Sequence, residues 1–205
     1  NEIKSDEIKY SFDDNDLIIF DDVNDKDVVT WSALCIIPPK SVWDPIQKIR
    51  KEHDKSYVRW MPHINLFFPF IKPNAIDFDK IKDAINKTFK KYDIKSKDIT
   101  LKEFSCFGRG LESNKSQYVF LEPTNKDFLN DLYDSLRIVF PGCQRGDGSF
   151  TPHLTVGQWP GKKCMNVITK YNDEWNPISF KLDKIYWIQR AHDKPFEIYK
   201  EFELL

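Results

Sequence analysis

Two short stretches of the chain carry histidine in the same setting. The first, WMPHINLFF, contains His63 and Asn65, and the second, FTPHLTVGQW, contains His153 and Thr155. In each stretch a proline precedes the histidine and apolar residues alternate with polar ones. The pattern predicts a strand on which the histidine and the polar residue two positions later share one face. A buried imidazole costs free energy unless it has partners, so finding this pattern twice is informative.

These residue types could cleave a phosphodiester without a metal. Such cleavage needs a base to activate water or a 2′-hydroxyl, an acid to protonate the leaving oxygen, and donors around the developing charge. An imidazole titrates near pH 6.5 and can take either proton role. We therefore expect His63 and His153 to form the acid–base pair and Asn65 and Thr155 to bind the phosphate. The sequence leaves open which histidine is the acid.

The elements around the two stretches are predicted in the same order twice. The order is strand, helix, strand with histidine, helix, strand, and the two histidines are 90 residues apart. Possible capping boxes begin two of the helices, Ser41 with Asp44 and Thr124 with Asp127. The predicted elements lie at 28–37, 41–53, 60–68, 77–92 and 99–107, then at 118–121, 124–139, 152–159, 162–171 and 180–189, with a last strand at 196–202.

This repetition predicts a duplicated α+β fold. We expect β-α-β-α-β lobes related by a pseudo-two-fold axis, with antiparallel sheets facing a central groove and helices outside. The 205 residues, 40% of them hydrophobic, suit one domain at 28–205, with intertwined lobes of about 28–110 and 111–205. Residues 1–27 carry a net charge of −7 and are expected to form an acidic leader, partly disordered or strapped to the domain around 17–20. The other 178 residues carry +6, which fits an anionic substrate but is also ordinary for solubility.

Neither a metal nor another cofactor is expected. Zinc needs three or four ligands, and only two histidines converge, although Cys143 lies ten residues before His153. The four cysteines show no CxxC spacing, which favours reduced thiols and a cytoplasmic or nuclear location. No apolar run approaches the roughly 20 residues that a membrane helix needs, so no membrane partner is expected.

The paired histidine motifs resemble those of the two-histidine (2H) phosphoesterase superfamily. Its hallmark is a pair of His-x-Thr/Ser motifs on central strands of a duplicated fold. Its members include RNA 2′,3′-cyclic phosphodiesterases, bacterial 2′-5′ RNA ligase-like proteins, 2′,5′-oligoadenylate phosphodiesterases and the enzyme that processes the 3′ end of U6 RNA. The resemblance covers about residues 28–205. The second motif is typical of the ligase-like branch, whereas Asn65 replaces the usual Thr or Ser and Gly157-Gln158 replaces a small residue followed by arginine.

Other residues are weaker candidates for binding a substrate. Arginines beside glycines could reach a phosphate, although the glycines could equally mark a mobile turn. Aromatic side chains could stack on bases, although most are expected in the core. The candidates are Arg109, Arg145, Tyr57, Trp60, Phe107 and Trp159, with Trp187 as a further aromatic residue.

The resemblance implies a metal-independent phosphodiesterase that acts on RNA ends or small nucleotides. A 2′,3′-cyclic phosphate or a 2′-5′ linkage is the first expected substrate, and trimming of a 3′ end is the second. The alternative is a non-catalytic module that binds nucleotides or RNA ends in the same groove. A third class, an interaction domain with structural histidines, would bind no nucleotide. We expect a monomer.

Overall fold

Two four-stranded antiparallel sheets form the centre of the protein. The computed structural model describes residues 8–205 apart from 14 and 109. We call the sheet with strand order β12-β11-β4-β5 the first sheet and the one with order β10-β7-β8-β9 the second sheet. The first comprises β4 (Ser32–Ile36), β5 (Ile64–Phe67), β11 (Lys184–Gln189) and β12 (Glu197–Glu203), and the second β7 (Lys97–Cys106), β8 (Ser116–Pro123), β9 (Leu154–Pro160) and β10 (Ile178–Leu182).

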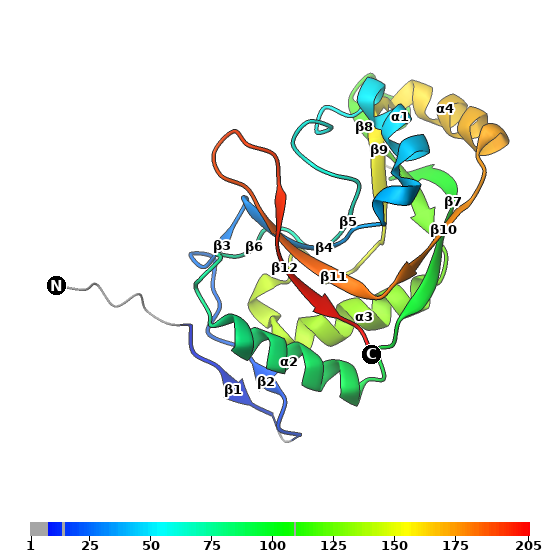
Figure 1. The fold of residues 1–205 in the computed structure, drawn as a ribbon. Coiled ribbons are helices and arrows are strands. Elements are labelled where there is room, and N and C mark those ends of the chain that lie inside the picture. The colour runs from blue at the N-terminus through cyan, green and yellow to red at the C-terminus, as the bar shows by residue number, and fades with distance from the viewer. Residues whose placement is uncertain (1–7, 14, 109) are drawn as a thin grey trace.

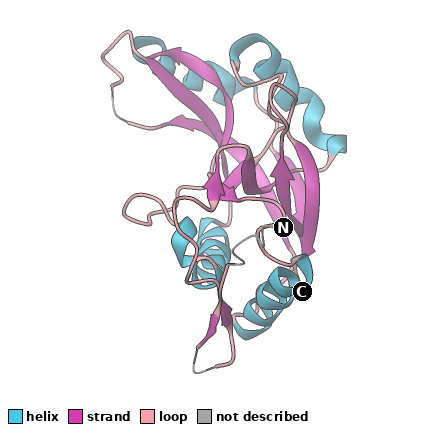
Figure 2. Ribbon diagram, turned by 90° about the vertical axis from the view of Figure 1, so that its left-hand side faces the viewer, coloured by secondary structure: helices cyan, strands magenta, loops and turns pink. Residues whose placement is uncertain are grey.

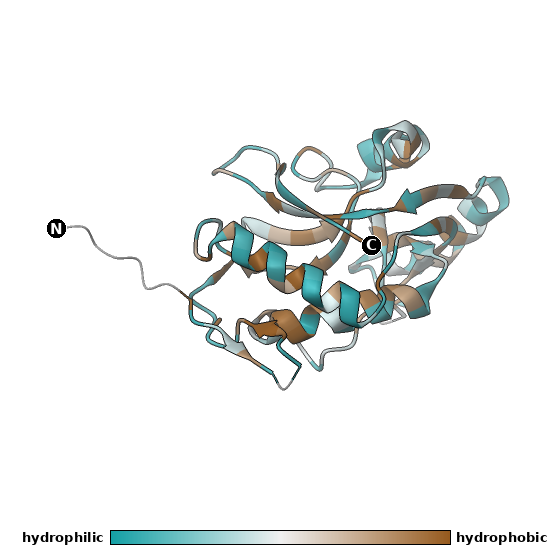
Figure 3. Cartoon of the chain, turned by 60° about the horizontal axis from the view of Figure 1, so that its bottom comes forward, coloured by the Kyte–Doolittle hydropathy of each residue, from teal (hydrophilic) through white to brown (hydrophobic). Residues whose placement is uncertain are grey.

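The α-helices of the described residues lie outside the strands (Figure 2). They are α1 (Trp43–His53), α2 (Phe78–Lys91), α3 (Lys126–Val139) and α4 (Gly161–Glu174), with short 3-10 turns at Lys40–Val42 and Pro141–Cys143. Helix α2 shows why these segments fold as they do. Ile81, Ile85 and Phe89 form one fully buried stripe, and the Asp77 side chain accepts a hydrogen bond from the Asp79 amide at the start. The other residues of α2 are mostly hydrophilic, as the alternating bands in Figure 3 show. The duplicated, antiparallel α+β fold predicted from the sequence is confirmed.

Each sheet is covered partly by a helix from the other half of the chain. Figure 1 shows α2 and α3 on one side of the first sheet, and α1 and α4 beside the second. At the end of α1, the His53 ring lies 4.6 Å from that of Trp159 on β9. At the equivalent place, Tyr133 of α3 stacks on Phe67 of β5 at 5.2 Å. A single hydrophobic core therefore runs through both sheets and fixes them relative to each other.

The histidine-bearing strands occupy equivalent places. Strands β5 and β9 are each the edge strand of their sheet, and they approach each other in space. Both strands begin one residue later than the histidine, so His63 and His153 lie just before the strands rather than inside them. Ile64 and Leu154 are fully buried behind them. The buried apolar faces of the two strands thus fix the direction of the opposite faces, which carry the polar residues.

Two predicted strands are interrupted, and both interruptions have a structural role. The strand predicted at 28–37 breaks at Thr30 and Trp31 into β3 (Val28–Val29) and β4, because β3 pairs with β6 (Phe70–Ile71) instead of continuing along the first sheet. The strand predicted at 180–189 divides at Asp183. Its first part, β10, pairs with β7 in the second sheet, and its second part, β11, pairs with β4 in the first.

Both predicted capping boxes are wrong. Helix α1 begins at Trp43 after a 3-10 turn, and no side chain caps it. Helix α3 begins after Asn125, which has a left-handed φ of 58°. No side chain caps this helix either. The Thr124 hydroxyl accepts a hydrogen bond from the Thr100 amide at 3.1 Å instead, so it ties α3's start to β7.

The described part of the leader lies against the domain. Strands β1 (Ser11–Phe12) and β2 (Ile18–Ile19) form a hairpin, and Leu17, Ile18 and Phe20 are buried. The Phe20 amide donates to the Val139 carbonyl at the end of α3. The leader expectation for residues 1–7 and 14 falls outside the described residues. Across the described chain, no helix has the length and apolar character needed to cross a membrane.

Candidate active site

The two histidines have the same tautomer and the same backbone anchor. The Nδ1 atom of His63 lies 2.7 Å from the Met61 carbonyl oxygen, and that of His153 lies 2.7 Å from the Thr151 carbonyl oxygen. A carbonyl oxygen can only accept, so Nδ1 carries the proton in each neutral ring. The Nε2 atoms are then unprotonated and can accept a proton from a bound molecule. The anchor residue is two positions before the histidine in both cases, as the duplication requires.

Both histidines line one groove of about 500 Å³. Asn65 and Thr155, two residues further along each strand, line it too. The structure therefore brings together the four residues that the two sequence motifs singled out. The groove also contains polar and aromatic side chains from both halves of the chain: Thr30, Asp54, Ser56, Arg59, Trp60, Phe68, Phe107, Tyr118, Gln158, Arg190 and Phe196.

The aromatic surroundings of the two imidazoles differ. Trp60 stacks almost parallel on His63, with 4.4 Å between centroids and 18° between planes. His153 instead meets Phe107 edge-on at 5.1 Å and Phe120 at 5.2 Å. The indole lies flat over one face of the His63 ring, whereas one edge-on ring and one tilted ring contact His153. The two imidazoles therefore differ in how much water can reach them.

The aromatic walls lower both histidine pKa values. Burial is the main cause and lowers the pKa of His63 to about 4, with smaller lowering by Arg50 and His153, while the Met61 carbonyl and Asp54 oppose the shift. Burial also lowers the pKa of His153, against the opposing effect of its hydrogen bond to Thr151. Both rings are therefore neutral at pH 7 in the unliganded protein, and His153 takes up a proton more readily than His63.

Asn65 and Thr155 supply different hydrogen-bonding groups at equivalent positions. Asn65 pairs with Cys35 on β4, and its Oδ1 atom is buried without a hydrogen-bond partner among the described residues. The amide also offers two N–H donors, whereas the Thr155 hydroxyl offers one donor and accepts as well. Both side chains can donate to a phosphate oxygen in the groove.

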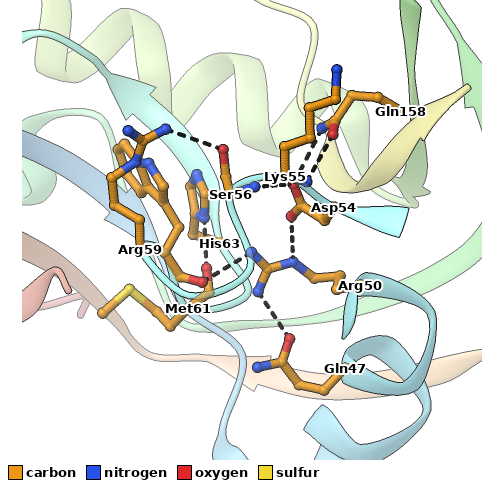
Figure 4. A network of polar contacts seen from close by, with 10 residues as sticks. Gln47, Arg50, Asp54, Lys55, Ser56, Arg59, Met61, His63 and Gln158 are labelled. Atoms are coloured by element: carbon orange, nitrogen blue, oxygen red, sulfur yellow. Dashed lines mark hydrogen bonds and ion pairs between the residues drawn. The ribbon is translucent and has the colours of Figure 1, made fainter. Parts of the chain in front are cut away.

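A buried ion pair connects the two sides of the groove (Figure 4). Arg50 Nε donates to Asp54 Oδ2 at 2.8 Å, and both side chains are almost fully buried. Arg50 Nη2 also donates to the Trp60 carbonyl at 2.9 Å. From β9, Gln158 Nε2 donates to Asp54 Oδ1 at 3.2 Å, and Gln158 Oε1 accepts from the Lys55 amide. The Arg50–Asp54 ion pair thus fixes Trp60 relative to β9, the strand that follows His153. Because the Trp60 ring stacks on His63, the ion pair also helps to position His63.

Gly157 allows this close approach of α1 to β9. A Cβ atom at position 157 would lie 2.7 Å from the His53 Cβ and 2.8 Å from the His53 carbonyl oxygen. Real Cβ atoms do not come so close, so only glycine fits here without movement. The Gly157-Gln158 pair, which departs from the ligase-like motif, therefore has a local role in joining α1 to β9.

Of the five weaker candidates that the structure describes, two lie in the groove. Trp60 and Phe107 line it, each against one histidine. The others lie elsewhere. Tyr57 faces a separate apolar pocket, Trp159 is buried against His53 and Tyr171, and Arg145 lies outside the groove 3.3 Å from Asp25. Trp187 is buried, with its indole N–H bonded to Ser32, and Arg109 falls outside the described residues.

The sequence reasoning missed two arginines that line the groove, Arg59 and Arg190. Neither has a carboxylate partner within 4 Å among the ion pairs of the described chain. Arg59 follows α1 in a loop and Arg190 follows β11, so neither belongs to a recognisable motif. The closeness of Arg59 to the first histidine stretch was the one signal that could have indicated it. No grouping of three His, Cys, Asp or Glu side chains within the described residues could hold a metal ion.

Comparison with known proteins assigns the family. The family model for the 2′-5′ RNA ligase superfamily matches residues 38–194, which include both histidine motifs. The chain belongs to this superfamily. The match confirms the resemblance to the 2H phosphoesterases that the two motifs predicted.

Individual relatives of this superfamily member are distant. A Geobacillus kaustophilus protein named "Putative phosphoesterase" is 25% identical over 174 residues, which cover 83% of this chain and 94% of that protein. One of the same description from Staphylococcus haemolyticus is 26% identical over 127 residues, covering 62% of this chain and 69% of the relative. The crystal structure of E. coli LigT complexed with 3′-AMP aligns with a TM-score of 0.47 and 16% identity, over 85% of this chain and 98% of LigT.

Proposed function

We propose that this protein is a phosphodiesterase that cleaves RNA ends or small nucleotides with His63 and His153 as its acid–base pair. One observation carries the proposal. Both imidazoles are anchored through Nδ1 and line one groove, so each has a free Nε2 with which to exchange a proton. Membership of the superfamily and the phosphoesterase names of the relatives support the same reaction class.

The roles of the two histidines follow from their unequal pKa values. His63 resists protonation most strongly, so we assign it as the base that removes a proton from a 2′-hydroxyl or a water. His153 accepts a proton more readily, so we assign it as the acid that protonates the leaving oxygen. A bound phosphodiester brings negative charge between the rings, which raises the pKa of an imidazole and favours the imidazolium that the acid needs. Asn65 and Thr155 would hold the non-bridging oxygens.

Within this class we rank two kinds of substrate. We propose a 2′,3′-cyclic phosphate or a 2′-5′ linkage first, and trimming of a 3′ end second. The two arginines without carboxylate partners, Arg59 and Arg190, favour a polyanionic ligand. Phe107 and Tyr118, which are 41% and 53% exposed, offer aromatic faces for a base on the His153 side.

The test is turnover in EDTA of a panel of four substrates. The panel contains a nucleoside 2′,3′-cyclic phosphate, a 2′-5′-linked dinucleotide, a 3′-5′ dinucleotide and a short RNA with a uridine end. We expect the wild type to cleave at least one member and the His63→Ala/His153→Ala variant to cleave none. Equal cleavage by both proteins would overturn the assignment of the histidines.

A non-catalytic nucleotide-binding module is the second candidate. The neutrality of both imidazoles in the free protein and the presence of Asn65 in place of Thr or Ser favour it. It predicts that a nucleoside 3′-monophosphate binds to the wild type while the whole panel stays uncleaved.

A further inference from the structure

A second hollow opens beside the groove that contains the two histidines. Its volume is about 530 Å³, and its walls include Trp31, Gln189, His192 and Glu197. Thr30 and Arg190 line both spaces. The second hollow is therefore a continuation of the groove on the side of the first sheet, with Arg190 at the junction.

The local fold explains why the hollow exists. The break between β3 and β4 places Thr30 and Trp31 in a turn, and the hairpin that joins β11 to β12 supplies the opposite wall. The Arg190 amide donates to the Trp31 carbonyl at 3.0 Å, which holds the turn against the hairpin. The interruption of the strand predicted at 28–37 thus creates an exposed indole, since 39% of Trp31 is accessible.

The chemistry of this continuation differs from that of the groove itself. Arg190 lies over the ring of Phe196, which limits its movement, and no carboxylate lies within 4 Å of its guanidinium among the described ion pairs. Beyond it come an exposed aromatic side chain and the hydrogen-bonding side chains of Gln189 and His192. Glu197 adds a carboxylate, which repels a phosphate but can accept from the amino group of a base. Moving outward from the histidines, a ligand would therefore meet the cation Arg190 first. It would then meet the aromatic Trp31 side chain, which polar groups flank.

We propose that this second hollow binds the nucleotide next to the scissile one in a single-stranded RNA. Arg190 would contact the phosphate that links the two nucleotides, and Trp31 would stack on the neighbouring base. The inference rests on the proposed function and sharpens it, because it makes an oligonucleotide end a better substrate than a mononucleotide. Stacking of one base on an aromatic side chain strengthens binding about tenfold or more and works with any base. The preference should therefore depend on length more than on sequence.

The experiment measures kcat/KM for 2′,3′-cyclic-phosphate-ended RNAs of one, two and three nucleotides. For the wild type we expect a rise of about tenfold or more from one nucleotide to two, and little further rise to three. Trp31→Ala and Arg190→Gln should each reduce the ratio between two nucleotides and one. Trp31→Phe should retain most of it, because a phenyl ring also stacks.

Matched controls separate this effect from general loss of aromatic surface or charge. Tyr92→Ala removes a similarly exposed aromatic ring beyond the end of α2, and Arg145→Gln removes an arginine outside both spaces. Both should keep the wild-type ratio. A wild-type ratio near one, with the mononucleotide cleaved, would overturn the second hollow as a binding site and leave the proposed function intact.

A binding measurement decides the inference if the wild type cleaves nothing. The affinities of RNAs of one and two nucleotides that end in a 3′-phosphate are then compared by calorimetry for the wild type and Trp31→Ala. A gain with length that Trp31→Ala removes would support the site although the proposed catalysis fails. Equal affinities for the two lengths would overturn it.

Discussion

The His63 and His153 sides of the groove share a backbone plan but differ in their surroundings. Each histidine follows a proline, precedes an edge strand and donates Nδ1–H to the carbonyl two residues earlier. Yet a nearly parallel indole covers His63, whereas His153 meets Phe107 edge-on and Phe120 at a tilt. The duplication therefore preserves the direction of the proton-accepting nitrogen, while side chains outside the motif set how readily each ring is protonated. Equal geometry with unequal pKa values suits a reaction that needs one base and one acid.

The largest expected effect tests the assignment of His63 as base and His153 as acid. A substrate whose leaving group needs no proton should make the acid unnecessary. On an ordinary nucleoside 3′-phosphodiester, we expect His63→Ala and His153→Ala each to lower kcat by about 10²–10⁴-fold. On a nucleoside 3′-(p-nitrophenyl phosphate), the leaving group departs without a proton. His153→Ala should then recover most of its activity, whereas His63→Ala should not. Recovery in His63→Ala alone would reverse the assigned roles.

A second difference between the sides concerns Asn65 and Thr155, which we propose bind the phosphate. We expect Asn65→Ala and Thr155→Ala each to lower kcat by about 10²-fold, as the loss of one donor to a developing charge does. Asn65→Thr should keep most of the activity, because a hydroxyl can also donate to a phosphate oxygen. Steady-state kinetics on the substrate identified by the panel would check this. An unchanged kcat in Asn65→Ala would make that side chain structural only.

The strands also differ in how closely a helix approaches them. Gly157 of β9 meets the backbone of α1, whereas the equivalent residue of β5, Phe67, packs through its side chain on Tyr133. Gly157→Ala should therefore destabilise the protein by about 1–3 kcal/mol through overpacking. Gly108→Ala, where nothing lies within 4 Å of the added Cβ, should change stability little. Urea unfolding of the two variants measures the difference, and equal midpoints would contradict it.

The last difference between the sides concerns how kcat/KM depends on pH, since that profile reports the ionisation of the free protein. In the proposed mechanism the reactive form has a neutral His63 and a protonated His153. Because burial holds the His153 pKa below 6.5, the fraction of this form falls about tenfold for each pH unit above the His153 pKa. At the acid end, protonation of His63 near pH 4 also removes the reactive form. The alkaline fall of kcat/KM should therefore begin below pH 6.5. The alkaline fall of kcat should begin at a higher pH, because bound phosphate raises the imidazolium pKa. A kcat/KM limb above pH 7 would contradict the lowered pKa values.

The order of elements was predictable because it depends on patterns repeated along the chain. The apolar stripe of α2 is visible in the sequence, as is the alternation around each histidine. The break at Thr30 and the change of sheet at Asp183 were not, because both are imposed by pairing with distant strands. The capping box at Thr124 failed for the same reason, since Thr124 bonds to β7 rather than to its own helix.

The residues of the candidate site also divide into those that the sequence could predict and those that it could not. Residues within the motifs could be placed on a common face from their spacing alone, and the structure brings all four into one groove. Arg59 and Arg190 reach it from loops, where spacing carries no such information. Composition could not separate the aromatic residues of the groove from those of the core. Trp60 and Trp159 each lie within six residues of a motif histidine, yet Trp60 lies against His63 in the groove and Trp159 lies beneath α1.

The exchange of strands between the halves has a consequence for biosynthesis. The second sheet is built from residues 97–182, which leave the ribosome as one uninterrupted segment. The first sheet must wait, because β11 and β12 complete it only after residue 184 is made. At about 5–20 residues per second, β4 and β5 remain without these partners for on the order of ten seconds. During that interval the unpaired edge of β4 is open to association with other nascent chains, so the His63 side is where a slow or truncated translation product would first aggregate.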